Sequence, residues 1–204
     1  MIYYPYDSRI HNVGNIGMGG KIHAMLAPFI TKSIDYKRYN GRDIRLEINN
    51  YLLTKYHNPM ILDLCCGTGI STFKYGIDTS PEFIDRAKKL YPRKYFKIAN
   101  AENFKPKLKY DIVTCMFAFH EMPEYAHHLI IQNSLKIAKK EIIILDISSN
   151  YTPSQIMLSG EPYLKTYLNT IDKTMNKYNF KKSNYIDNHV DYWNLINPSD
   201  KILS

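Results

Sequence analysis

From Pro59 onward the chain alternates short, continuous apolar runs with segments of helical periodicity. The apolar runs cover residues 60–65, 75–77, 95–99, 112–116 and 142–145. Runs of this length without polar alternation are typical of strands buried on both faces, as in a parallel sheet covered by helices. The pattern therefore predicts an α/β fold with a doubly wound, mostly parallel sheet.

The segments between and after these runs have the periodicity and end signals of helices. Ser80 followed by Pro81 indicates a helix start, because serine caps the first turn and proline suits its first position. Further helices are expected over residues 123–138 and 162–178, and the segment 185–195 is expected to close the sheet with more strands.

The first 57 residues have a different texture. Ile44, Ile48 and Leu52 recur at helical spacing and predict an amphipathic helix packed on a larger body. Apolar residues between Ile22 and Ile30 also recur at helical spacing, although Pro28 should kink or end that helix. We therefore expect an N-terminal helical extension or lid at residues 1–57, packed on a core domain at residues 58–204.

Length and composition limit the classes of protein that remain. A chain of 204 residues can bury a core as one domain without a metal or disulfide. It has no apolar run long enough to span a membrane and no secretory signal at its start, so we expect no membrane partner and a cytoplasmic location. The three cysteines lack the spacing of metal ligands, so no metal site is expected.

The first predicted strand runs directly into the glycine turn Cys65-Cys-Gly-Thr-Gly69. Glycine lets the backbone approach a ligand closely, and free N–H groups follow such a turn. Thr72 stands where a dinucleotide fingerprint would need a third glycine, which disfavours a nicotinamide cofactor. Taken alone, the turn leaves a purely structural role open.

The ends of the next strands carry further polar residues. Asp78 ends the second predicted strand, where doubly wound folds place a carboxylate that binds both ribose hydroxyls of a nucleoside. The segments 100–104 and 117–123 follow the third and fourth strands. Since the carboxyl ends of parallel strands meet at one edge of a sheet, the sequence predicts a nucleoside site there.

In this order the motifs of residues 59–148 resemble those of the class I S-adenosylmethionine-dependent methyltransferases, in the large group that acts mostly on small molecules. The resemblance implies a Rossmann-like methyltransferase fold, S-adenosylmethionine as cofactor and a small-molecule acceptor that is not identified. It implies that the turn holds the methionine part, Asp78 the ribose and the segment 100–102 the adenine. The implied cofactor residues are Asp63, Cys65, Gly67, Gly69, Asp78, Thr79, Asn100, Ala101, Glu102 and Phe117.

One departure from this family concerns the helix after the glycine motif. Only eight residues lie between Gly69 and Asp78, and at about 1.5 Å per residue the segment 70–74 makes little more than one helical turn. Either the N-terminal helices fill the gap on that face of the sheet, or cofactor binding is weakened. A catalytically inactive binding module that keeps the fold is therefore an alternative.

His120 and Glu121 are the catalytic candidates, because they follow the fourth strand and imidazole can take a proton near neutral pH. A role in capping the next helix is the alternative for both residues. His11 and His23, in or after the glycine-rich N-terminal stretch, could join the site if that stretch closes as a lid. Arg42 and Arg45 could pair with a carboxylate on the cofactor or acceptor, although a solvated helix face is the preferred interpretation.

A basic stretch supplies the other functional alternative. The stretch from Arg86 to Lys109 contains nine bases and one acid, Glu102. Its local excess of +8 equals the net charge of the whole chain. Such a face can attract nucleic acid or other polyanions. An RNA or protein methyltransferase that uses this face is therefore the second enzymatic hypothesis. The alternative is that the stretch is only a solvated surface.

Overall fold

The structure, a computed structural model, describes residues 9–10, 13–196 and 198. Its centre is a seven-stranded sheet in the order β5-β4-β3-β6-β7-β9-β8, with β3 to β7 parallel and β9 antiparallel to both neighbours. The strands are β3 (Ile61–Leu64), β4 (Tyr75–Asp78), β5 (Tyr95–Ile98), β6 (Tyr110–Met116), β7 (Ala138–Ile147), β8 (Lys181–Ile186) and β9 (Val190–Ile196). The predicted doubly wound α/β fold is confirmed.

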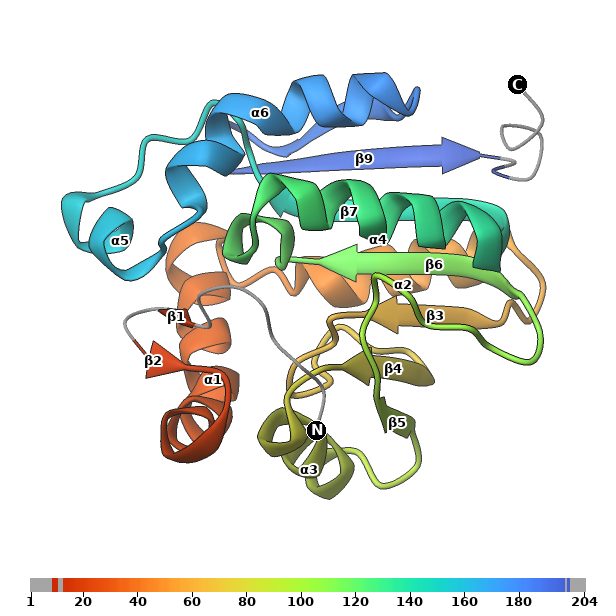
Figure 1. The fold of residues 1–204 in the computed structure, drawn as a ribbon, viewed down its shortest axis with the longest axis horizontal. Coiled ribbons are helices and arrows are strands. Elements are labelled where there is room, and N and C mark those ends of the chain that lie inside the picture. The colour runs from red at the N-terminus through yellow and green to blue at the C-terminus, as the bar shows by residue number, and fades with distance from the viewer. Residues whose placement is uncertain (1–8, 11–12, 197, 199–204) are drawn as a thin grey trace.

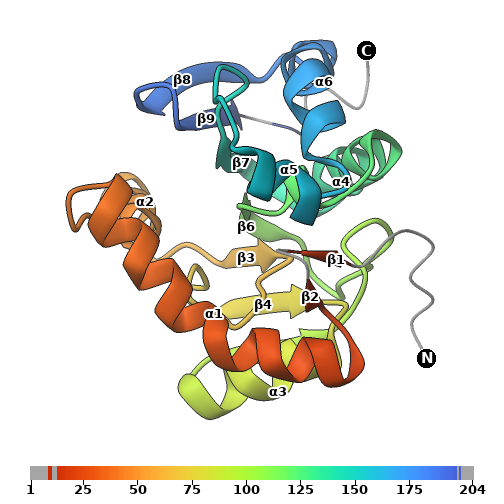
Figure 2. The same cartoon turned by 90° about the vertical axis from the view of Figure 1, so that its left-hand side faces the viewer.

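Helices cover both faces of this sheet (Figures 1 and 2). Helix α2 (Ile44–Lys55) packs on one face, and α4 (Glu124–Ile137) and α6 (Leu164–Lys177) pack on the other. Helix α3 (Pro81–Leu90) packs beside β4 and β5. The proline and serine signals at its start are confirmed, because Ser80 Oγ accepts a hydrogen bond from Phe83 N–H.

The remaining elements gather at the carboxyl ends of the parallel strands (Figure 1). Helix α1 (Gly17–Arg38) crosses that edge, beside the short α5 (Gln155–Gly160) and the 3-10 turn η1 (Phe119–Glu121). A two-stranded ribbon, β1 (Arg9–Ile10) with β2 (Val13–Gly14), precedes α1. Because the chain order reverses between β3 and β6, this edge is the switch point where such sheets bind ligands.

The segment between β3 and β4 contains no helix, not even the short one expected from the sequence. Helix α2 covers this face of the sheet instead: its Ile44, Ile48 and Leu52 are buried in one cluster with Ile61 of β3 and Ile112 of β6. Asn49 of α2 also donates a hydrogen bond of 2.8 Å to the carbonyl of Ser71. The N-terminal helices therefore fill the gap left by the missing one.

A buried acid anchors the far end of α2. Glu141 of β7 is fully buried and accepts hydrogen bonds from Lys55 Nζ and from the hydroxyl of Tyr56, at 2.9 and 3.0 Å from its Oε2. Asn194 of β9 donates to the other oxygen at 2.9 Å. A buried carboxylate needs such partners, so the end of α2 is fixed against the middle of the sheet.

Helix α1 differs from its sequence expectation in two ways. It continues through Pro28, which costs one backbone hydrogen bond without ending the helix. Its repeated apolar residues also lie exposed: Ile22, Met25, Leu26 and Phe29 face away from the sheet rather than onto it. Periodicity shows that a stripe exists but not which way it faces.

Within the part of the chain that the structure describes, no helix is long and apolar enough to cross a membrane.

The role of α2 in the core can be tested with two neighbouring leucines. Leu52→Ala should lower the free energy of unfolding by about 2–5 kcal/mol, since it empties a fully buried site. Leu53→Ala, at the next position and exposed to solvent, should change it by less than about 1 kcal/mol. Urea unfolding of both variants measures the difference, and equal small losses would show that α2 is not part of the core.

Candidate active site

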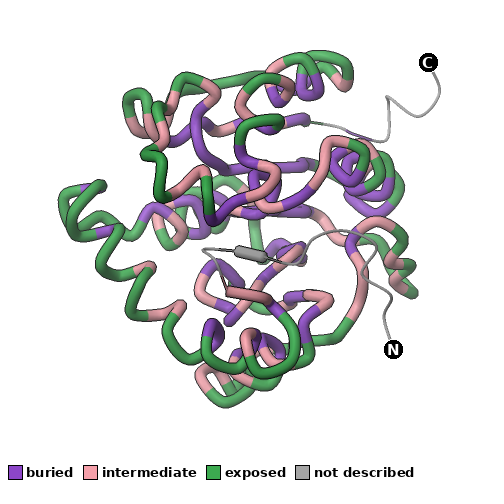
Figure 3. The backbone as a smooth tube through the Cα atoms, turned by 60° about the vertical axis from the view of Figure 1, so that its left-hand side comes forward, coloured by how far each residue is buried: buried purple, intermediate pink, exposed green. Residues whose placement is uncertain are grey.

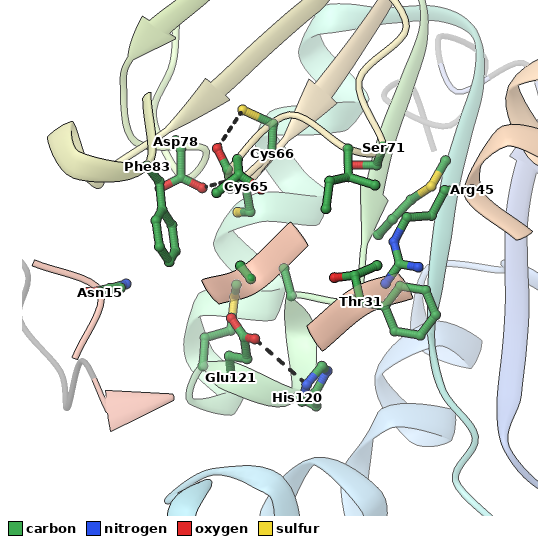
Figure 4. A pocket seen from close by; sticks show the side chains of 18 of the residues that line it. Asn15, Thr31, Arg45, Cys65, Cys66, Ser71, Asp78, Phe83, His120 and Glu121 are labelled. Carbon is green, nitrogen blue, oxygen red and sulfur yellow. Dashed lines mark hydrogen bonds and ion pairs between the residues drawn. The ribbon is translucent and has the colours of Figure 1, made fainter. Parts of the chain in front are cut away.

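A cleft lies at the carboxyl ends of β3, β4 and β6, beneath α1 (Figure 4). The loop after β3 lines it with residues 65–68, the end of β4 with Asp78 and Thr79, and the end of β6 with residues 116–118. Most of the predicted site residues meet here. Those that line the cleft are Cys65, Gly67, Asp78, Thr79, Asn100, Ala101, Phe117, His120 and Glu121.

The carboxylate of Asp78 is held by two backbone amides. Gly67 N–H donates to Oδ2 and Ser80 N–H donates to Oδ1, each at 2.8 Å. Burial raises the pKa of Asp78, while these hydrogen bonds lower it. Each oxygen retains capacity for a further hydrogen bond, so the acid is positioned at the cleft and still able to accept two hydroxyl groups.

The two glycines of the turn have different surroundings. Both have positive φ, 51° at Gly67 and 83° at Gly69. A Cβ at Gly67 would meet nothing within 4 Å, whereas one at Gly69 would lie 2.6 Å from the ring of Phe96. Gly67 thus leaves open space in the cleft, and Gly69 lets the turn pack against β5.

Two further cleft residues adopt the left-handed conformation without being glycine. They are Cys65, with φ of 53°, and Phe117, with φ of 56°. Each follows the carboxyl end of a strand, β3 and β6 respectively. Such conformations cost about 1–3 kcal/mol each and concentrate at functional sites, so the backbone is strained on both sides of the switch point.

Three predicted cofactor residues do not line the cleft: Asp63, Gly69 and Glu102. Asp63 lies under the loop, 1% exposed, and accepts hydrogen bonds from the hydroxyls of Ser71, Thr72 and Thr114 at 2.7, 2.8 and 3.0 Å. Burial raises its pKa to about 6 against the effect of these hydrogen bonds. Asp63 therefore holds the loop in place from below. The backbone of Glu102 donates to Asn100 Oδ1, which shapes the neighbouring segment.

His120 forms a buried pair with Asp146, a residue at the end of β7 that the sequence analysis missed. The Nδ1 atom of His120 lies 2.6 Å from Asp146 Oδ1, and Glu121 Oε1 lies 3.8 Å from Nε2. Burial alone would lower the pKa of His120, but the charge and hydrogen bond of Asp146 raise it to about 9. His120 is thus an imidazolium at neutral pH in this state.

Asp146 also fixes the loop that carries His120. Its Oδ2 atom accepts hydrogen bonds from the amides of Ala118 and Phe119, and its Oδ1 atom accepts one from Ile147 N–H. The acid could have been found from the sequence, because it ends an apolar strand at the same edge as Asp78. Its partner could not, because only the folded loop brings the two together.

Helix α1 closes the cleft and adds residues that had uncertain roles. His23 is buried and packs edge-on against Phe83, with ring centroids 5.1 Å apart, and both residues line the cleft. Arg45 of α2 lines it too, 4.2 Å above the ring of Phe117 and paired with Asp35 of α1 at 3.3 Å. Arg42 instead pairs with Glu47 at the surface. His11 lies outside the described residues.

The start of α1 is latched to α3. Gly17 N–H donates to Glu82 Oε1 at 2.8 Å, and the hydroxyl of Ser80 donates to the carbonyl of Asn15. Ser80 is also the residue whose amide binds Asp78. Ser80 therefore binds both the acid of the cleft and the backbone that precedes α1.

Comparisons with known proteins fit this geometry. Residues 61–141 match the model of a family described as a methyltransferase domain. Over this segment the chain is similar to methyltransferase domains. The match runs from β3 into β7 and includes the glycine turn and Asp78. It confirms the expected class of enzyme and the class I resemblance. The comparison with curated proteins gave no match.

Solved structures with the same fold include several methyltransferases. Magnesium protoporphyrin IX methyltransferase (ChlM) from Synechocystis PCC 6803 with bound SAM has 13% identity and a TM-score of 0.56, over 85% of this chain and 96% of that one. The plantazolicin methyltransferase BpumL with SAH and a pentazolic analogue has 16% identity and 0.58, over 87% and 94%. N-methyltransferase NodS from Bradyrhizobium japonicum WM9 has 12% identity and 0.57, over 81% and 99%.

The pairing of His120 with Asp146 can be tested by titration. In Asp146→Asn the pKa of His120 should fall by at least about one unit, because burial remains while the negative charge is lost. Proton and nitrogen NMR of the labelled histidines measures this pKa in both proteins. His189, whose pKa is lowered by burial and by the charge of Arg38 and not by Asp146, should titrate identically in both proteins. An unchanged His120 would refute the role given to Asp146.

Proposed function

We propose that this protein binds S-adenosylmethionine in the cleft and transfers its methyl group to a small-molecule acceptor. The observation that carries the proposal is the pair of hydrogen bonds from backbone amides that fix Asp78 beside the glycine turn. The family match and the neighbours crystallised with SAM or SAH support the same cofactor. Helix α1 acts as the lid of this site, and α2 adds to its wall through Arg45.

The residues of the cleft fit such a cofactor. The free hydrogen-bonding capacity of Asp78 suits the two hydroxyls of a ribose. Gly67, where an added Cβ would meet nothing within 4 Å, leaves room for the methionine part, and Cys65 lines the cleft in the same loop. Asn100 and Ala101 would contact the adenine, and Thr79 lies beside Asp78 at the same end of β4.

When bound, the cofactor supplies a methyl group on a positively charged sulfur. The chain has to hold an acceptor in line with that group and exclude water. Helix α1 closes the cleft, and Phe117 and Arg45 form its wall near His120. Some acceptors must lose a proton, and His120 would accept that proton at Nε2. This requires a neutral imidazole, and the positive charge of a bound cofactor would lower the pKa of His120 towards that state.

The rest of the cleft suits a small apolar or aromatic acceptor. Beyond Phe117 it is lined by Tyr39 and His189, whose rings meet edge to face at 5.3 Å. A second hollow adjoins it and shares Ile34, Met157 and His189 as lining residues. Tyr151 stacks on His189 there, with ring centroids 4.8 Å apart. Aromatic walls of this kind bind flat or apolar groups.

The basic stretch does not favour the RNA or protein alternative. Its bases lie on α3, in the loop between α3 and β5, on β5 and in the loop before β6, and none of them lines the cleft. Lys94 is occupied with the fold, because its Nζ donates to the carbonyl of Thr72. The solvated-surface interpretation therefore suffices. A cytoplasmic location stays a prediction.

Cofactor binding depends on Asp78 in this proposal. Asp78→Asn should weaken S-adenosylmethionine binding at least about tenfold, because a charge-assisted hydrogen bond becomes neutral. Asp85→Asn, an exposed position on α3, is the matched control and should bind like the wild type. Isothermal titration calorimetry measures both, and no binding by folded wild-type protein at millimolar cofactor would refute the function.

Turnover can be followed with labelled methyl donor and fractionated cell extract. With the fraction that acquires label, the rate should rise with pH towards the pKa of His120, near 9 in the free protein. His120→Gln should remove this dependence and slow transfer by about 100-fold. Transfer that is slow and independent of pH in both proteins would exclude His120 as the base.

A further inference from the structure

The outer face of α1 carries a row of exposed apolar side chains. Met18, Ile22, Met25 and Phe29 follow one another at three- and four-residue spacing, and Leu26 lies beside them. These five residues form a continuous stripe, here called the α1 stripe. All five are exposed, with Met18 at 71% and Phe29 at 67%. Single exposed apolar residues are ordinary, but a contiguous stripe marks an interaction surface.

The stripe is not needed to build the cleft. The opposite face of α1 does that, with His23, Ala27, Thr31 and Ile34 among the lining residues. Figure 3 shows α1 as a largely exposed helix on one side of the molecule, and Figure 2 shows it lying across the strand ends. The apolar residues of the α1 stripe therefore have no role in closing the cleft.

The charges on α1 indicate the chemistry of the partner. Lys21 and Lys32 each follow a stripe residue by three positions, so they border the stripe along one edge. Lys37 and Arg38 follow in the last turn. The helix has one acid, Asp35, which is buried and paired with Arg45. The outer face is thus apolar with a basic border and no acid on it.

This combination distinguishes between two possible occupants. A second copy of the chain, packed with its α1 antiparallel to this one around a two-fold axis, would place the same basic border opposite itself, and like charges would repel. An anionic lipid surface offers acyl chains for the stripe and negative headgroups for the lysines.

We propose that α1 docks the protein on an anionic lipid surface, with the α1 stripe among the headgroups and acyl chains. Lys21 and Lys32 then contact the lipid phosphates and carboxylates. The proposal departs from the sequence expectation of no membrane partner. It does not depend on the methyltransferase function.

Co-sedimentation with vesicles tests this docking. The full chain should bind vesicles of phosphatidylcholine and phosphatidylserine in equal parts at least about tenfold more tightly than phosphatidylcholine alone. The double variant Met18→Ser/Phe29→Ser should bind the mixed vesicles at least about tenfold more weakly, because two inserted apolar side chains are lost. Lys21→Gln/Lys32→Gln should lose a similar factor, and this loss should shrink at high salt.

Leu108→Ser is the matched control, because Leu108 is 72% exposed but lies far along the chain, in the loop before β6. It should bind as the wild type does. Lys107→Gln/Lys109→Gln controls in the same way for the loss of two charges elsewhere. Circular dichroism melting of each variant shows that it is folded.

Three results would overturn the proposal. The first is no preference for the mixed vesicles. The second is full binding by the folded Met18→Ser/Phe29→Ser variant, which would assign any vesicle binding to other basic residues such as those between Arg86 and Lys109. The third is a lipid-free dimer, measured by analytical ultracentrifugation, that this variant abolishes while the wild type does not bind vesicles; the occupant would then be a second copy.

Discussion

The buried carboxylate of Asp63 supports the part of the fold on which the site depends. The segment 65–74 between β3 and β4 is too short for a helix of ordinary length, so it cannot satisfy its backbone in that way. Asp63 instead binds the hydroxyls of Ser71, Thr72 and Thr114, and Asn49 of α2 binds the carbonyl of Ser71. A polar network and a helix from the N-terminal region thus replace the missing element, and the glycine turn keeps its position.

Carboxylates at strand ends organise the rest of the cleft. Asp78 at the end of β4 holds the amide of Gly67, and Asp146 at the end of β7 holds the amides of Ala118 and Phe119. Each acid therefore fixes the loop that follows a different strand. A site assembled in this way is positioned before any ligand arrives, which lowers the cost of ordering on binding.

Local patterns were sufficient for much of this structure. The apolar runs predicted the five parallel strands, Ser80-Pro81 predicted the start of α3, and the glycine turn with Asp78 predicted the place of the cleft. The direction in which α1 faces could not be predicted, because periodicity does not say which side of a stripe meets the sheet. Asp146 and Arg45 were missed or undervalued, since their partners lie far away in the chain and meet them only in the folded protein.

The two bonds of Ser80 have a consequence for the passage of molecules into and out of the cleft. Its amide binds Asp78, and its hydroxyl binds the backbone just ahead of α1. Swinging the first turn of α1 outward would break the second bond and disturb the residue that maintains the first. If Asp78 binds the ribose as proposed, release of the cofactor and outward movement of α1 would be thermodynamically linked, and a bound ribose would disfavour opening of the cleft at this helix.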